Sequence, residues 1–176
     1  MFTPKTNYAK IAYDTILFFV STGQVRKPNE DKISADLKVK MACIVSIFDL
    51  NDKLIGYYGN VTPQTDSFYD EITENAIRAV KNDKFDPIQS DQLNQIKVYV
   101  DGLSTLHKVE DINELKPHKH GLFIKDKSGK SGYIMPNHKG VKTVENQIEI
   151  IKKENQIAEK ESSDLELWYF KSIRYD

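Results

Sequence analysis

The chain has 176 residues, of which 39% are hydrophobic and 29% are charged. This composition excludes bulk disorder and fits one soluble globular domain, 1–176, that buries a substantial core. Twenty-five basic and 26 acidic residues give a net charge of −1. A general nucleic-acid-binding protein usually carries a clear basic excess, so nucleic acid is a disfavoured partner.

The single cysteine, Cys43, bears on the compartment of the protein. It excludes an intramolecular disulfide and a cysteine-based zinc site, and it favours a reducing cytoplasm. The apolar run from Ile16 to Val20 is far too short to span a membrane, and no signal-peptide cleavage pattern follows it. We therefore expect a cytoplasmic protein without a membrane segment.

In the first half of the chain, apolar periodicity predicts two helices and a hairpin. The expected elements are a helix over Thr3–Val20, strands over Met41–Phe48 and Leu54–Tyr58, and a helix from Asp66 or Ser67 to about Asn82. Thr3 is the expected N-cap of the first helix, with Pro4 in its first position, and Gly23 suits its exit.

The second half predicts four strands and a helix. The expected elements are strands over Ile96–Val100, Gly121–Ile124, Gly132–Met135 and Leu165–Phe170, and a helix from Thr143 to about Lys160. Residues 126–129 look like a hairpin turn, and residues 104–117 have no clear assignment. Because hairpins require antiparallel pairing, we predict an α+β fold with a largely antiparallel central sheet flanked by helices.

The first candidate site is Gly56-Tyr57-Tyr58-Gly59 at the end of a predicted strand. Two glycines three residues apart, followed by a loop and a helix, allow a ligand to approach the backbone. The alternative is a strand that bends at its glycines. The segment lacks the third glycine of a dinucleotide-binding motif and the Gly-Lys-Ser/Thr of a phosphate-binding loop.

Histidines and a serine form two further candidates. His118 and His120 have the His-x-His spacing of metal ligands, with a third ligand needed from His107, His138 or a carboxylate. The alternative is a pair of exposed loop histidines, and we predict no metal and no cofactor. Ser131 is a nucleophile only if a histidine such as His120 or His138 lies beside it, and turn geometry is its simpler role.

Two residues in predicted secondary structure have favoured structural interpretations. Asn75 lies within the apolar stripe of a helix, so a buried amide that holds neighbouring backbone is favoured over catalysis. Cys43 lies within an apolar strand and is interpreted as a small buried hydrophobe rather than a reactive thiol.

Five ordered segments of the chain resemble the AMMECR family, named after a chromosomal region linked to Alport syndrome, mental retardation, midface hypoplasia and elliptocytosis. The segment ACIVSIFDLNDKLIGYYG resembles the family's strand-turn-strand ending in Leu-Arg-Gly-Cys-Ile-Gly. ENAIRAVKNDKFDPI resembles its Asn-Ala helix and connector. The other three are QIKVYVDGL, KHGLFIKDKSGKSGYIMPN and LELWYFKSI. The resemblance covers nearly the whole chain.

The hallmark residues of the family are replaced in this chain. The arginine of the motif falls on Ile55 and its cysteine on Tyr57, and Tyr58 stands in place of its isoleucine. Only Gly56 and Gly59 keep the pattern. Isoleucine cannot bind an anion and tyrosine cannot act as a thiolate, so an activity that uses the Arg/Cys pair is expected to be absent.

The resemblance also implies an architecture and partners. It implies a central antiparallel sheet with a smaller lobe and the motif lining a cleft, but no settled reaction. Some members are associated with Memo-like proteins, which resemble non-haem iron dioxygenases, and with radical SAM proteins. This chain lacks the Cys-x3-Cys-x2-Cys motif of a radical SAM protein, so such proteins are expected only as partners.

Three functions follow from these observations. The leading hypothesis is a non-catalytic or degenerate AMMECR-like accessory subunit that binds a partner protein or small ligand at the Gly56–Gly59 cleft. The first alternative is an enzyme of unknown reaction that uses Asn75, His120 and Ser131. The second is a nucleic-acid-associated protein, which is disfavoured because only three of the 25 basic residues are arginine.

Overall fold

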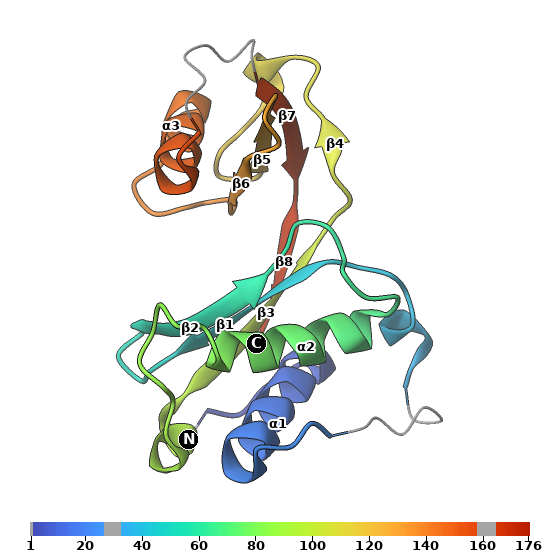
Figure 1. Ribbon diagram of the computed structural model, residues 1–176. Helices are drawn as coiled ribbons and strands as arrows, with labels where there is room; N and C mark the ends of the chain where they lie inside the picture. Colours follow the sequence, from blue (N-terminus) through green and yellow to red (C-terminus); the bar gives the residue numbers. More distant parts are fainter. Residues whose placement is uncertain (1, 27–32, 158–164) are drawn as a thin grey trace. The chain divides into compact units, whose positions relative to one another are not determined.

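The structure is a computed structural model that describes residues 2–26, 33–157 and 165–176 (Figure 1). These residues divide into two compact units, Met1–Leu103 with Ile173–Asp176, and Ser104–Ser172. Each unit has its own hydrophobic core. The expectation of one domain over 1–176 stays a prediction.

The first unit places two helices against a four-stranded sheet with the strand order β2-β1-β3-β8. Both helices lie on the same side of this sheet (Figure 1). β1 pairs antiparallel with both β2 and β3. The elements are α1 (Asn7–Thr22), β1 (Cys43–Phe48), β2 (Leu54–Gly59), α2 (Phe68–Val80), β3 (Lys97–Leu103) and β8 (Ser172–Tyr175), with short 3-10 turns at Ala35–Leu37 and Ser90–Gln95.

The start of α1 differs from the sequence-based prediction. Its N-cap is Thr6, whose hydroxyl accepts a hydrogen bond from the backbone N–H of Ala9 at 3.2 Å. The predicted cap, Thr3, lies outside the helix, because the N–H groups of Lys5 and Thr6 donate instead to the backbone carbonyl of Asp176. The predicted exit is confirmed: Gly23 closes the helix in the left-handed conformation, with φ of 70°.

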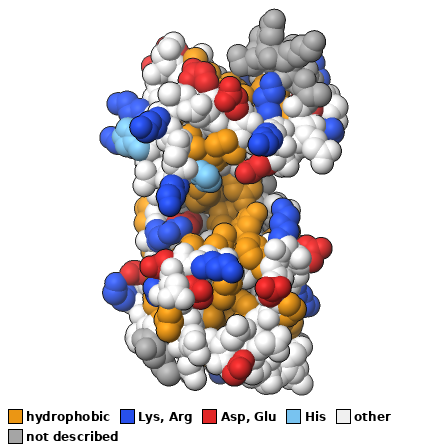
Figure 2. All heavy atoms as spheres, turned by 90° about the vertical axis from the view of Figure 1, so that its left-hand side faces the viewer, with side chains coloured by type: hydrophobic (Ala, Val, Ile, Leu, Met, Phe, Trp, Pro, Cys, Tyr) orange, Lys and Arg blue, Asp and Glu red, His pale blue; other side chains and the backbone are white. Residues whose placement is uncertain are grey.

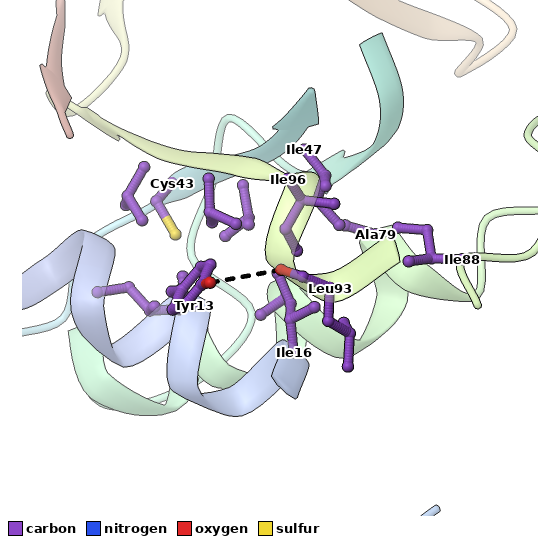
Figure 3. Packing of buried hydrophobic residues seen from close by; sticks show 14 of the residues in the cluster. Tyr13, Ile16, Cys43, Ile47, Ala79, Ile88, Leu93 and Ile96 are labelled. Carbon is purple, nitrogen blue, oxygen red and sulfur yellow. Dashed lines mark hydrogen bonds between the residues drawn. The ribbon is translucent and has the colours of Figure 1, made fainter. Parts of the chain in front are cut away.

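Alternating residues of β1 build the core of the first unit. Cys43, Val45 and Ile47 are fully buried and belong to the cluster that packs against α1 and α2. Figure 3 shows this packing and the hydroxyl of Tyr13, which donates to the backbone carbonyl of Leu93 at 3.4 Å. The period-two pattern of an antiparallel strand thus places one face of β1 in the core and the other on the opposite side of the sheet.

The second unit packs one helix against a sheet with the strand order β4-β7-β5-β6. Its pairings β4–β7, β7–β5 and β5–β6 are all antiparallel. The core consists mainly of leucine and isoleucine side chains from β5, β6 and α3. The elements are β4 (His107–Lys108), a 3-10 turn at Ile112–Glu114, β5 (Gly121–Asp126), β6 (Ser131–Ile134), α3 (Val144–Asn155) and β7 (Leu165–Phe170).

The end of α3 also differs from its prediction. The helix begins after the predicted cap Thr143 but ends at Asn155, where Gln156 adopts the left-handed conformation with φ of 54°. The N–H of Ile157 donates to the carbonyl of Lys152 at 3.0 Å, which closes the last turn. The predicted extension over residues 158–160 lies outside the described residues.

The predicted fold class is confirmed, and the arrangement of the strands adds detail to it. The chain has an α+β fold in which β1–β2, β1–β3, β4–β7, β5–β6 and β5–β7 all pair antiparallel. The strands form two separate four-stranded sheets rather than one. β4 and β8 were not predicted from the sequence. No helix within the described residues is both long and apolar enough to cross a membrane.

Candidate functional site

The candidate Gly56–Gly59 segment lies on β2, which is an edge strand of the first sheet. Tyr58 pairs with Val45, so it shares the face that carries the helices. Tyr57 pairs with Ser46 and therefore points to the opposite face. Both tyrosines are half-buried.

Gly56 allows close packing between α2 and β2. A Cβ atom at this position would lie 2.8 Å from the backbone carbonyl oxygen of Ala79. A Cβ at Gly59 would collide with the backbone carbonyl oxygen of Cys43 on the neighbouring strand. The glycines are thus explained by the packing of this unit, in line with the structural interpretation of the motif.

The pairing register between β1 and β2 shifts at Ile55. Ile47 pairs with Gly56 and Phe48 pairs with Leu54, which leaves Ile55 unpaired in the ladder. Its side chain is partly buried against the core of the first unit. Ile55 therefore has a packing role on β2.

The two tyrosines contact residues of α2 and of the segment that follows it. The guanidinium of Arg78 lies 5.2 Å from the centre of the Tyr58 ring, and it donates a hydrogen bond to the Tyr58 hydroxyl at 3.1 Å. The ring of Tyr57 packs edge-on against Phe85, with centroids 5.8 Å apart. The side-chain amide of Asn82 donates to the backbone carbonyl of Tyr57 at 2.8 Å. These contacts hold Tyr57 and Tyr58 in place at the edge of the sheet, next to Phe85 and Arg78.

Asn75 and Glu71 of α2 form a buried polar network with β1 and with the loop before α2. Asn75 is 3% exposed and donates through Nδ2 to the backbone carbonyl of Cys43 at 3.0 Å and to Oε1 of Glu71 at 3.4 Å. Oε2 of Glu71 accepts the N–H groups of Gln64 and Thr65 at 2.8 and 3.0 Å. The network joins α2 to β1 and to the loop before α2, so Asn75 has a structural role.

Cys43 is not an available thiol in the folded protein. Its side chain is fully buried, and burial is the main cause that raises its pKa to about 12. It faces the helices, whereas Tyr57 points to the opposite side of the sheet. Cys43 therefore does not take the place of the cysteine that Tyr57 replaces.

His120 and Ser131 both lie in the second unit, but they lie beside opposite ends of β5. His120 immediately precedes β5, and Ser131 pairs with Lys125 near the hairpin turn. His120 and Lys125, the partner of Ser131, are five residues apart along the strand, a distance of roughly 17 Å. The structure does not bring the two side chains together. Asn75 lies in the other unit.

The ring of His120 is held at Nδ1 and has a depressed pKa. Nδ1 accepts a hydrogen bond from the backbone N–H of Lys116 at 3.1 Å. Burial, followed by the charges of Lys171, Lys116, Lys119 and His118, lowers the pKa of His120. In the described parts of the chain, no three His, Cys, Asp or Glu side chains gather in a way that could hold a metal ion.

Charges are distributed evenly over the face of the molecule in Figure 2. Basic and acidic side chains are interspersed there, without a continuous expanse of one sign. This distribution agrees with the net charge of −1.

Two residues of the first unit were missed by sequence reasoning. Arg78 contacts Tyr58 across twenty positions of the chain, and Glu71 accepts hydrogen bonds from a loop that precedes its own helix. Neither contact follows a helical or strand spacing, so no local pattern marks these residues as important. The pairing of Asn82 and Phe85 with Tyr57 is likewise set by the fold.

The described residues define an α+β protein with an aromatic edge strand backed by a buried polar network. A protein-family model described as AMMECR1 matches residues 9–175. The chain belongs to the AMMECR1 family, as its motifs predicted.

Two relatives are similar to this chain in sequence, and one solved structure shares its fold. The chain is 34% identical to a Thermotoga maritima protein over 169 residues, which cover 96% of both chains. It is 33% identical to a Clostridium acetobutylicum protein over 148 residues, which cover 83% of this chain and 31% of that protein. The crystal structure of an uncharacterised Pyrococcus horikoshii protein, PH0010, has the same fold, with a TM-score of 0.82 at 18% identity over 95% of this chain and 88% of that one.

Proposed function

We propose that the chain is a non-catalytic AMMECR1-family subunit that binds a partner protein through β2, at Gly56–Gly59. The observation that carries this proposal is the composition of that edge: Tyr57 and Tyr58 are half-buried and are supported by Phe85 and Arg78. Tyrosine, phenylalanine and arginine are enriched in protein interfaces, and tyrosine and arginine in their energetic hot spots.

The burial of Cys43, the only cysteine of the chain, supports a non-catalytic role. The family's motif has a cysteine where this chain has Tyr57, and Cys43 is buried with a strongly raised pKa. Thiolate chemistry at the motif therefore has no residue to perform it. This proposal predicts that a thiol reagent at pH 8 modifies Cys43 only when the protein unfolds. Rapid modification of the native protein would contradict it.

The partner class comes from the association of some AMMECR family members with Memo-like and radical SAM proteins. We propose a protein of one of these two classes as the partner. The Clostridium relative supports a unit that works beside another module, because the region similar to this chain makes up only 31% of that protein. A small ligand at the same strand is the alternative occupant.

Binding to a purified Memo-like or radical SAM protein from the same cells tests the proposal. Isothermal titration calorimetry measures the affinity of the parent chain and of Tyr57→Ala. A hot-spot tyrosine contributes about 2 kcal/mol, so the variant is expected to bind about 30-fold more weakly. Tyr133→Ala is the matched control, because Tyr133 is a half-buried tyrosine on β6, the edge strand of the other sheet.

Circular dichroism must show that both variants remain folded. Equal losses of affinity in Tyr57→Ala and Tyr133→Ala would show that β2 does not form the interface. A double variant that restores the motif, Ile55→Arg with Tyr57→Cys, adds a second test. If it changes neither partner binding nor ligand binding, the Gly56–Gly59 segment has no special role.

A further inference from the structure

The segment Lys116–His120, which we call the basic turn, is a compact loop in the second unit. The N–H groups of Lys119 and His120 both donate to the carbonyl of Lys116 at 2.8 Å. The carbonyl of Pro117 accepts the N–H of Asn137 at 2.8 Å, and Gln147 of α3 donates to the carbonyl of His120 at 3.0 Å. Gln147 is 1% exposed, so the basic turn is anchored to the buried part of its unit.

The hydrogen bonding of His120 determines its tautomer. Because Nδ1 accepts the N–H of Lys116, the neutral ring carries its proton on Nε2. The ring also packs against Tyr169 with centroids 4.9 Å apart, so its orientation is fixed. Nε2 forms no hydrogen bond with a described residue, which leaves this donor available to a ligand.

Basic residues lie close to His120 in the fold: Lys116 and Lys119 belong to the same turn, and Lys171 follows Phe170, which pairs with Gly121. Lys116, Lys119 and Lys171 are exposed, and none of them forms an ion pair with a described residue. All the charged groups that act on His120 are basic, and together with burial they lower its pKa. The backbone of Lys171 is held by two hydrogen bonds of 2.9 Å to Ser104.

We propose that Nε2–H of His120 and the ammonium groups of Lys116, Lys119 and Lys171 bind a phosphate group. This site goes beyond the proposed function, because it lies in the other unit and shares no residue with β2. A phosphate offers a charge near −2 and three strong acceptor oxygens, which suits several cations and one neutral donor. Tyr169 already contacts the rings of His107 and His120, so phosphate rather than base stacking is the recognised feature.

Nuclear magnetic resonance of the histidine side chains in the full chain tests this site. The probes are inorganic phosphate, adenosine monophosphate and a short single-stranded DNA, each at constant ionic strength, with chloride as the reference. We expect saturable shifts of the His120 resonances with phosphate and a higher His120 pKa in its presence. Binding should weaken about tenfold in His120→Ala and roughly two- to fivefold in Lys119→Gln or Lys171→Gln.

Lys125→Gln is the matched control, because Lys125 is an exposed lysine near the far end of β5. It should bind phosphate as the parent does. Equal binding of inorganic phosphate and the nucleotide supports recognition of phosphate alone, and tighter nucleotide or DNA binding identifies the source of the phosphate. Shifts that chloride reproduces, or saturable binding that the His120 and lysine variants leave unchanged, would overturn the proposal.

Discussion

Replacing Asn75 with alanine separates a structural role of this residue from a catalytic one. The side chain is 3% exposed, and its amide donates to the carbonyl of Cys43 at 3.0 Å and to Glu71 at 3.4 Å. Both acceptors belong to residues that are buried from solvent. We therefore expect a large loss of stability.

The expected magnitude follows from the number of groups that lose a partner. A buried polar group left without its hydrogen bond costs about 1–3 kcal/mol. Two acceptors are affected here, one of them through a long bond, so the free energy of unfolding should fall by about 2–3 kcal/mol. For a chain of this size each kcal/mol lowers Tm by about 2–4 °C, which gives a decrease of roughly 4–12 °C.

Urea denaturation followed by circular dichroism measures this change. Trp168, the only tryptophan of the chain, lies on β7 in the second unit, so its fluorescence reports separately on that unit. Asn113→Ala is the control: the exposed amide of Asn113 donates to Asp111, and the stability of this variant should change by less than about 0.5 kcal/mol. If Asn75→Ala were equally neutral but lost partner binding or turnover, the structural assignment of Asn75 would be refuted.

Three further predictions concern packing, an ion pair and pH. In Gly56→Ala the new Cβ meets the carbonyl of Ala79 at 2.8 Å, so thermal unfolding should show a loss of about 1–3 kcal/mol. Arg174→Lys loses the two-pronged contact with buried Asp101, at 2.9 and 2.7 Å; because the arginine side chain is half exposed, a loss of about 1 kcal/mol in urea unfolding is expected. The folded-state pKa of His120 is lowered, so its stabilisation is present above about pH 6.5 and is lost as the pH falls below that value. His120→Gln should therefore lose less stability than the parent between pH 7 and pH 5, and an equal loss in both would contradict this assignment.

The segments that were predicted correctly from the sequence are those whose conformation is set by residues close to one another in the chain. Ser67 and Thr143 accept hydrogen bonds from backbone N–H groups in the first turns of α2 and α3, and Gly23 adopts the conformation that suits a helix exit. These effects involve residues within four positions of one another. For the same reason β1, a run of apolar and β-branched residues, and the hairpin turn after Asp126 were predictable.

The errors occur where distant residues decide the conformation. Thr3 is as good a cap as Thr6, but hydrogen bonds to the carbonyl of Asp176 keep the chain extended up to Thr6. The charged end of α3 has no clear stop signal before Gln156, so the helix was predicted too long. β8 is short and polar, and it is stabilised in part by the pairing of Arg174 with Asp101, 73 residues away.

The sequence by itself determined the fold class, the family and the replacement of the motif's arginine and cysteine by Ile55 and Tyr57. These follow from residue types and short spacings, which need no knowledge of the rest of the chain. Only the tertiary structure decided that Cys43 faces the helices, that Tyr57 points to the other side of the sheet, and that Ser131 on β6 lies far from His120, which precedes β5. These facts depend on strand register and sheet order, which are set by contacts between residues far apart in the chain.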